Sequence, residues 1–294
     1  MRLAVTGASG FCGAVVARLA AAAGVDVVCL GRRPGPVGAH VGWNAARDTP
    51  DLAGVDAVVH LAAAVGDPRP GQATEAAFRA VNVHGTERLL AAAGNRPVVW
   101  VSSASVYRPG PYPAPIGEDH PMDGQRNAYG RTKADGDRLA LAGGAVVLRP
   151  RAVYGAGDRH LLPRLRRVVR GGRAWLPGPD VPLSLTAVEN LADACLAALG
   201  WPPGAYNIAD AGRYSRDAIV GAVLKVPVRH VPRRLAQLSP AVTRYALDQL
   251  TDGMVLDTTR ASGQGWRPTR TLDDFLAAHP GQTAPRGSLR VDGA

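Results

Sequence analysis

A tyrosine and a lysine stand four residues apart in the stretch AYGRTKADGDRLA, which runs from residue 128 to residue 140. On a helix, Tyr129 and Lys133 would lie one turn apart on the same face. A model-peptide tyrosine titrates at about pH 10, and a nearby ammonium group lowers that pKa by stabilising the phenolate. Only two of the 34 basic Lys and Arg residues are lysines, so this one is conspicuous. The spacing predicts a proton donor, Tyr129, activated by Lys133.

Three glycines at intervals of three, Gly7, Gly10 and Gly13, join a predicted strand over residues 2–7 to a predicted helix over residues 11–24. Glycine lets the backbone turn sharply and approach a pyrophosphate, and a helix N-terminus supplies amide donors at the positive end of its dipole. This arrangement predicts a dinucleotide-binding loop.

Short apolar segments alternate with helical patterns over the first two hundred residues. Strands are predicted at residues 2–7, 26–31, 55–63, 97–103, 145–150 and 204–210, and helices at residues 11–24, 73–94 and 188–200. Strands rich in Val, Leu and Ala, each followed by a helix, are typical of a parallel sheet covered on both faces. We therefore predict an α/β fold, a Rossmann-type doubly wound parallel sheet with a smaller, irregular C-terminal substrate domain.

The pattern changes after Gly155, where prolines divide the chain into short pieces. We expect the dinucleotide-binding domain to cover residues 1–155, with residues 186–209 returning to it. Residues 156–185 and 210–279 are expected to form the substrate domain, and residues 280–294 a disordered tail.

The sequence resembles the extended short-chain dehydrogenase/reductase family, also called the NAD-dependent epimerase/dehydratase family, because several of its motifs occur here in order. These are TGASGFCG at 6–13, VVHLAA at 58–63, NVHGTERLL at 82–90, VSSASVY at 101–107, YGRTK at 129–133, LRPRAVYGAGD at 148–158 and DTTRASGQGWRP at 257–268. The last segment departs from the family pattern, since Gly263-Gln264-Gly265 replaces the usual Leu-Gly.

The resemblance implies a catalytic triad of Ser103, Tyr129 and Lys133. The Ser103 hydroxyl would hydrogen-bond the substrate oxygen and stabilise the transition state. Tyr129 would exchange the proton, and Lys133 would both lower the tyrosine pKa and bind a ribose hydroxyl. Ser102 and Ser105 are the neighbours with which Ser103 could be confused.

The resemblance also implies a nicotinamide dinucleotide cofactor. The residues expected to bind it are Gly7, Ser9, Gly10, Phe11, Cys12, Gly13, Arg32, Arg33, Leu61, Ala62, Ala63, Asn82, Tyr129, Lys133, Pro150 and Val153. Within this set, Asn82 is expected to position the backbone or the cofactor ribose. The nearby His60 is expected to be structural.

The end of the second predicted strand bears on the choice of cofactor. NAD enzymes normally carry an acidic residue there for the ribose diol, whereas this chain has Gly31, Arg32 and Arg33. Guanidinium groups pair with a 2′-phosphate, so we predict NADP(H), with NAD(H) as the alternative if the two arginines stand there by chance.

Two departures from family patterns indicate which of the family's reactions to expect. Ala104 and Ser105 follow Ser103 where dehydratases usually carry Asp-Glu, so dehydration is not expected. Nucleotide-sugar enzymes usually carry Arg and His where this chain has Leu183 and Ala187. Four residues near this position suggest an apolar pocket. Three other arginines of the chain could replace the arginine that is missing at Leu183. The four are Val181, Pro182, Leu183 and Leu185, and the arginines are Arg164, Arg167 and Arg213.

These observations predict an NADPH-dependent ketoreductase that reduces an apolar biosynthetic intermediate, such as a polyketide, in secondary metabolism. Two alternatives remain open. One is a nucleotide-sugar epimerase or 4-ketoreductase, and the other is a non-enzymatic NAD(P)-sensing regulator.

The bulk composition does not indicate another kind of partner. The net charge is +10, but the densest arginines, within residues 161–175, are expected on the solvated face of a helix, and no nucleic-acid-binding motif accompanies them. The three cysteines match no metal or disulfide spacing, and no apolar run reaches the roughly 18 residues of a membrane span. We therefore expect a cytoplasmic monomer or homodimer without metal, membrane or nucleic-acid partners.

Overall fold

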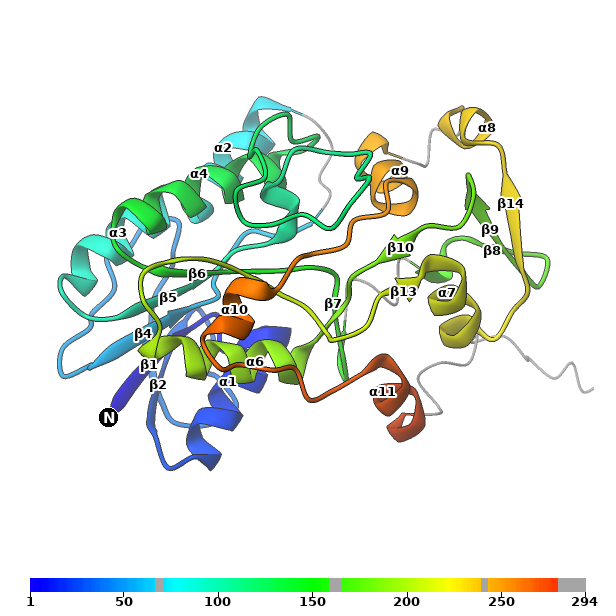
Figure 1. Cartoon of the computed structure of the whole chain (residues 1–294). Coiled ribbons are helices and arrows are strands. Elements are labelled where there is room, and N and C mark those ends of the chain that lie inside the picture. The colour runs from blue at the N-terminus through cyan, green and yellow to red at the C-terminus, as the bar shows by residue number, and fades with distance from the viewer. Residues whose placement is uncertain (67–70, 159–164, 239–242, 280–294) are drawn as a thin grey trace, which may run out of the picture.

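A seven-stranded parallel sheet forms the centre of the protein in the computed structural model, which describes residues 1–66, 71–158, 165–238 and 243–279 (Figure 1). The strand order is β12-β6-β5-β4-β1-β2-β3, and every neighbouring pair is parallel. The strands are β1 Arg2–Thr6, β2 Asp26–Gly31, β3 Ala39–Gly42, β4 Ala57–His60, β5 Val98–Val101, β6 Val146–Pro150 and β12 Gly204–Ile208. This is the predicted Rossmann-type architecture.

Helices cover both faces of this sheet. Helices α1 (Phe11–Ala22) and α6 (Val188–Ala197) lie on one face, and α2 (Gln72–Asn82), α3 (His84–Ala93) and α4 (Ala128–Ala142) lie on the other (Figure 1). Side chains alternate along a strand, so each strand serves two cores. In β1, Leu3 and Val5 join the hydrophobic cluster containing α1 and α6, whereas Ala4 joins the cluster on the α3 and α4 side.

The helical stretch predicted at residues 73–94 is two helices, not one. The backbone leaves ideal helical dihedrals at Val83, where φ is −110° and ψ is −68°. The second helix then approaches a loop closely, since a Cβ on Gly85 would lie 2.5 Å from the Ala45 carbonyl oxygen. The edge strand β3 was not predicted, because three of its four residues are exposed and it shows no apolar alternation.

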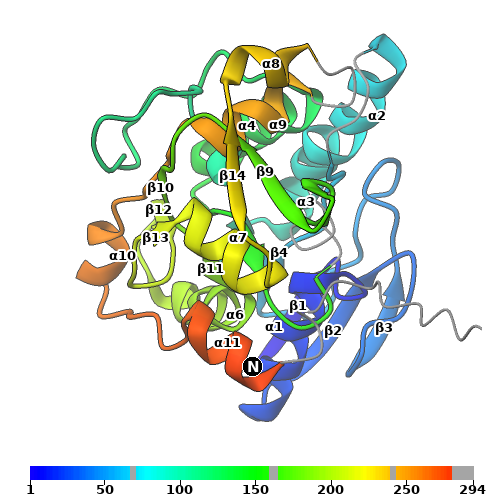
Figure 2. The same ribbon diagram turned by 90° about the vertical axis from the view of Figure 1, so that its right-hand side faces the viewer.

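Smaller sheets lie beyond the carboxyl end of the large sheet (Figure 2). Strands β8 (Val169–Arg170), β9 (Arg173–Pro177) and β14 (Val228–Val231) form one of them. Two further pairs join β7 (Val153–Tyr154) with β11 (Thr186–Ala187), and β10 (Pro182–Leu183) with β13 (Tyr214–Ser215). The accompanying helices are α7 Arg216–Leu224, α8 Arg233–Gln237, α9 Arg244–Thr251 and α11 Leu272–Ala278. Helix α10 (Thr259–Gly263) instead packs against the large sheet, where Ala261 joins the same hydrophobic cluster as α1 and α6.

The arginine-rich segment differs from its predicted helix, because Val169 lies in β8 and pairs with β9. Residues 161–164 of that segment, and the predicted tail at residues 280–294, lie outside the described residues. All three cysteines, Cys12, Cys29 and Cys195, are free. Across the described ranges, no helix combines the length and apolar character that a membrane crossing requires.

Candidate active site

The glycine loop between β1 and α1 is too tight for side chains at two of its glycines. Gly7 has a φ of +68°, and a Cβ there would lie 2.9 Å from the Ala62 amide nitrogen. A Cβ on Gly13 would lie 2.4 Å from the Gly7 carbonyl oxygen. Gly10 precedes α1, and no side chain caps that helix. The bare loop and the uncapped helix N-terminus therefore fit the pyrophosphate of a dinucleotide.

The other predicted cofactor residues cluster around the carboxyl ends of the strands. Ser9 is exposed, and Phe11 and Cys12, at the start of α1, are half-buried. Pro150 ends β6, and Val153 opens β7. The Gly7 amide donates to the Leu30 carbonyl at 3.1 Å, which joins the glycine loop to the end of β2. Just beyond this point Arg32 and Arg33 are exposed, and in the described part of the chain neither forms an ion pair.

A buried histidine fixes the chain beyond β4. The Thr6 hydroxyl oxygen accepts from the amides of Leu61 and Ala62 at 3.1 and 3.0 Å, and lies 2.8 Å from His60 Nδ1. Because two amides already donate to it, this hydroxyl directs its hydrogen to the histidine. Burial, assisted by the charge of Lys133, lowers the pKa of His60 to about 3. His60 is thus a neutral hydrogen-bond acceptor, which supports its structural interpretation.

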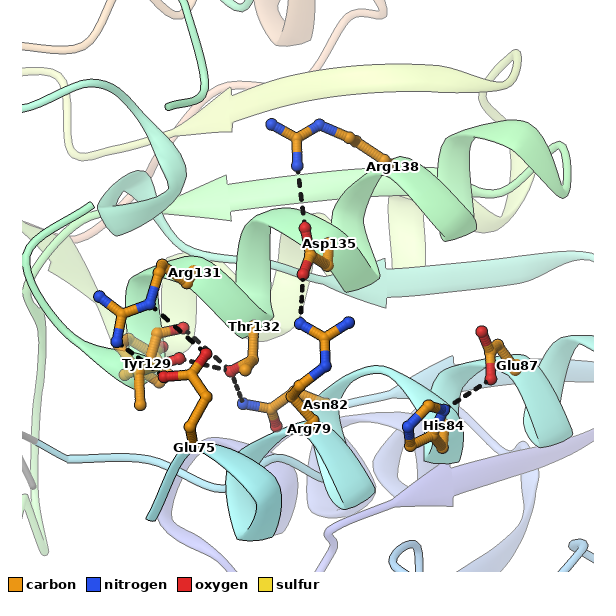
Figure 3. A network of polar contacts seen from close by, with 11 residues as sticks. Glu75, Arg79, Asn82, His84, Glu87, Tyr129, Arg131, Thr132, Asp135 and Arg138 are labelled. Atoms are coloured by element: carbon orange, nitrogen blue, oxygen red, sulfur yellow. Dashed lines mark hydrogen bonds and ion pairs between the residues drawn. The ribbon is translucent and has the colours of Figure 1, made fainter. Parts of the chain in front are cut away.

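Asn82 connects the segment after β4 with α4. Its side-chain amide donates to the Ala64 carbonyl and to Thr132 Oγ1, each at 3.0 Å, and its Oδ1 accepts from the Ala64 amide at 2.8 Å. Figure 3 shows Asn82 and Thr132 facing one another between α2 and α4. These contacts support the expectation that Asn82 positions the backbone.

The three serines after β5 have different surroundings. Ser102 is buried and donates to Asp137 at 2.5 Å. The oxygen of Ser103 accepts from the amide and the hydroxyl of Ser105, at 3.2 and 2.9 Å, as the N-cap of the short helix Ala104–Val106. Neither contact uses the Ser103 hydroxyl hydrogen. That hydrogen is available for a substrate oxygen, so the role of Ser103 stays a prediction; Ser105 is the serine of this group that lines the pocket described below.

Tyr129 lies in the first turn of α4 and is half-buried. The Asn127 side chain caps this helix by accepting from the Gly130 amide at 2.9 Å. A Cβ on Gly130 would lie 3.0 Å from the Ser105 carbonyl oxygen. This close packing of α4 against the segment after β5 brings the backbone around Tyr129 next to that around Ser103.

Lys133 is buried at the end of β5. Its Nζ donates to the Val101 carbonyl at 2.7 Å and lies 3.6 Å from the centre of the Trp100 ring, a cation–π contact. Burial lowers the pKa of Lys133 to about 7, although Asp137 acts in the opposite direction. Among the described residues, no carboxylate forms an ion pair with Lys133. A ligand that contacts its ammonium group would therefore change the pKa of Lys133.

A buried network that was not predicted from the sequence supports this edge of the sheet. Arg149 donates to both oxygens of Asp137, at 3.0 and 2.7 Å, and to Tyr107 and the Glu118 carbonyl at 3.2 and 2.8 Å. Burial alone would lower the pKa of Arg149, but the Asp137 carboxylate holds it above its ordinary value. The one sequence signal was an arginine within the otherwise apolar strand of residues 145–150.

A pocket opens beside these residues, between the segment after β5, the start of α4, and α9 (Arg244–Thr251). Its lining residues are Ala104, Ser105, Tyr107, Pro109, Tyr112, Gln125, Arg126, Asn127, Gly130, Arg151, Tyr245, Asp248, Gln249, Asp252 and Met254. Polar and charged side chains make up most of this list, and the four residues that suggested an apolar pocket are not among them.

The four residues that suggested an apolar pocket lie in and around β10, outside the pocket just described. Leu183 and Leu185 are buried in the C-terminal hydrophobic cluster, with Val181 packed against it and Pro182 exposed. Leu183 and Leu185 therefore fill a core, whereas Val181 and Pro182 line a second pocket beside the β10–β13 pair. The arginines considered as replacements do not line the first pocket either. Arg167 is exposed outside it, Arg213 lines the second pocket with Val181 and Pro182, and Arg164 lies outside the described residues.

The fold and the glycine loop define a Rossmann-type enzyme that uses a nicotinamide dinucleotide. Residues 3–209 match the model of the NAD dependent epimerase/dehydratase family, and the chain belongs to this family. It is thus an NAD(P)-dependent oxidoreductase of the short-chain dehydrogenase/reductase superfamily.

Three relatives are similar in sequence. The chain is 33% identical to a 4-hydroxy-2-methyl-3-oxo-4-farnesyl-3,4-dihydroquinoline-1-oxide ketoreductase of Stigmatella aurantiaca, over 69% of this chain and 66% of that protein. It is 32% identical to a 2-alkyl-3-oxoalkanoate reductase of Stenotrophomonas maltophilia, over 70% and 67%. It is 34% identical to a "Probable dTDP-4,6-dihydroxy-2-methyloxan-3-one 4-ketoreductase" of Streptomyces antibioticus, over 95% and 98%.

A solved structure confirms the fold. A short-chain dehydrogenase/reductase superfamily protein from Agrobacterium tumefaciens, with bound NAD, has a TM-score of 0.77 and 24% identity, and the match covers 95% of each chain.

Proposed function

We propose that this protein is an NADPH-dependent ketoreductase that converts a small-molecule ketone into an alcohol. The observation that carries the proposal is the packing of α4 against the segment after β5: Gly130, next to Tyr129, meets the Ser105 carbonyl, and Lys133 donates to the Val101 carbonyl at the end of β5. All three relatives described above are named as ketoreductases or reductases, and this agrees with the proposal.

Each residue of the triad has a distinct task in this reaction. The glycine loop would bind NADPH, which would supply the hydride. Ser103 donates its unused hydroxyl hydrogen to the carbonyl oxygen, and Tyr129 delivers the proton as negative charge develops there. Lys133 holds a ribose hydroxyl and stabilises the phenolate that Tyr129 becomes.

A nucleotide-sugar 4-ketoreductase or epimerase is the second candidate, because the relative matched over 95% of this chain is named for a dTDP-linked substrate. The position where such enzymes usually carry arginine is Leu183, which is buried in a hydrophobic core. A spectrophotometric screen of NADPH oxidation with simple ketones and dTDP-linked 4-keto sugars tests the two candidates. Turnover of free ketones supports the first, and turnover confined to nucleotide sugars supports the second.

The choice of NADPH rests on the exposed arginines after β2. An Arg32→Ala, Arg33→Ala double variant should weaken NADPH binding by about 10- to 100-fold, because each arginine offers a charge-assisted hydrogen bond to the 2′-phosphate. NADH binding should change little. Fluorescence titration of both cofactors measures this difference, and equal affinities of the unaltered protein for NADPH and NADH would contradict the assignment.

The depressed pKa of Lys133 predicts a pH dependence of cofactor binding. Below about pH 7 the free protein carries the ammonium form, and above it the neutral amine. Cofactor affinity should therefore fall as the pH rises through about 7, and a Lys133→Met variant should lose this dependence. Titrations with NADH isolate the effect, because the 2′-phosphate of NADPH itself titrates at about pH 6. A pH-independent NADH affinity from pH 6 to 9 would contradict the ribose-binding role.

A further inference from the structure

Arg151 is a buried cation that the fold leaves without a full set of partners. It directly follows β6, is 5% exposed, and lines the pocket beside the triad. Its Nε is buried and makes no hydrogen bond, the one such buried side-chain atom found in the described residues. Burying a guanidinium without compensation costs several kcal/mol, so a fold gains no stability from such an arrangement.

The acidic groups of the pocket are occupied by other arginines. Asp248 pairs with Arg126 and Arg233, both at 2.9 Å, and Asp252 pairs with Arg233 at 3.2 Å. Asp252 also accepts a hydrogen bond from Thr251 at 3.0 Å. Within the described ranges, no carboxylate lies within ion-pairing distance of Arg151.

The groups that face Arg151 leave it charged. Burial lowers the pKa of Arg151 to about 10, while Tyr112, Tyr245 and Asp252 act in the opposite direction. These three residues line the same pocket. At neutral pH the pocket therefore contains a positive charge that the surrounding carboxylates balance only from a distance.

The same pocket reaches the triad. Ser105 lines it and donates to Ser103 at 2.9 Å, and Gly130, which follows Tyr129, lines it as well. The pocket that Arg151 lines therefore begins beside Ser103 and Tyr129, although neither of these two residues is part of its lining.

We propose that Arg151 binds a carboxylate of the substrate, so that the preferred substrates are keto acids and Arg151 determines this specificity. This inference rests on the proposed ketoreductase activity for the identity of the reacting group. A carboxylate can accept two parallel hydrogen bonds from a guanidinium, and this pairing supplies the Nε partner that the protein lacks.

The test compares oxo acids with their uncharged methyl esters. Decanoates carrying the ketone at carbon 3, 4 or 5 sample different separations between ketone and carboxylate. For at least one pair, the unaltered protein should have a kcat/KM for the acid at least tenfold above that for the ester. Arg151→Met should lower kcat/KM for this acid by about 10- to 100-fold and leave the ester within about threefold. Arg131→Met, which removes an exposed arginine paired with Glu75, controls for net charge and should leave the acid-to-ester ratio unchanged.

A binding measurement separates this inference from the activity on which it rests. With NADP⁺ present, octanoate should raise the Tm of the unaltered protein more than octanamide does, and Arg151→Met should abolish that difference. The variant without ligand should melt no lower than the unaltered protein, because an unpaired buried charge has been removed. If no ketone is reduced but octanoate stabilises through Arg151, the activity is wrong and the carboxylate site stands. An unchanged acid-to-ester ratio in Arg151→Met, or equal stabilisation by octanoate and octanamide, overturns the carboxylate site.

Discussion

A Tyr129→Phe variant should lose about 10²- to 10⁴-fold in kcat, the usual contribution of a positioned general acid. The phenol hydroxyl is the one group removed, and α4 keeps its cap, because the Asn127 side chain accepts from the Gly130 amide. NADPH affinity should barely change, because the hydroxyl acts at the substrate carbonyl. Steady-state kinetics and fluorescence titration on the same preparation measure both quantities.

Two comparisons make the Tyr129 result specific. Tyr206→Phe removes a buried hydroxyl that donates to the Pro202 carbonyl, far along the sequence from the triad, and should leave kcat unchanged. Lys133→Ala should lower both kcat and cofactor affinity, because it removes the phenolate-stabilising charge and a ribose donor. If Tyr129→Phe retains most of its kcat, the substrate supplies its own proton and Tyr129 is not the donor.

An Asp137→Ala variant should lose about 3–5 kcal/mol of unfolding free energy, the cost of leaving a buried cation unpaired. Asp137 is fully buried, and its carboxylate receives two hydrogen bonds from Arg149 and one from Ser102. The variant leaves the Arg149 guanidinium, only 2% exposed, without an anion. Urea unfolding monitored by circular dichroism measures the loss.

The same helix provides the matched control. Asp135 lies two residues before Asp137 and is 35% exposed, and it pairs with Arg79 and Arg138 on the surface (Figure 3). Asp135→Ala should cost less than about 1 kcal/mol, because exposed ion pairs are screened by water. Similar losses in the two variants would show that the buried pair contributes no more than a surface pair.

Local patterns in the sequence were enough to predict the central sheet and the glycine loop. Each strand of the parallel sheet except β3 is a short apolar run, and such runs are visible without knowledge of their neighbours. Gly7 and Gly13 stand where a side chain would collide with nearby backbone, so residue type alone marks that turn. The exposed edge strand β3 lacks an apolar pattern and was missed for that reason.

Long-range polar pairing could not be predicted in this way. Arg149 lies in a strand and Asp137 in a helix, and only the packed structure shows that they form a buried ion pair. The pocket depends on α9, more than a hundred residues after Tyr129, and its charged residues come from separate segments: Arg126 precedes α4, Arg151 follows β6, and Asp248 lies in α9. Leu183 shows the converse error, since an apolar residue at a motif position was taken for a pocket wall and instead fills a core.

The central claim is that this protein transfers a hydride from NADPH to a ketone carbon. The most direct measurement uses NADPH carrying deuterium at both positions of nicotinamide C4, together with a ketone that the protein turns over, and mass spectrometry of the product. We predict one deuterium on the carbinol carbon for each NADPH consumed, with that label lost when the cofactor is not deuterated. A product without deuterium, or an inverted sugar formed with no net consumption of NADPH, would contradict the claim.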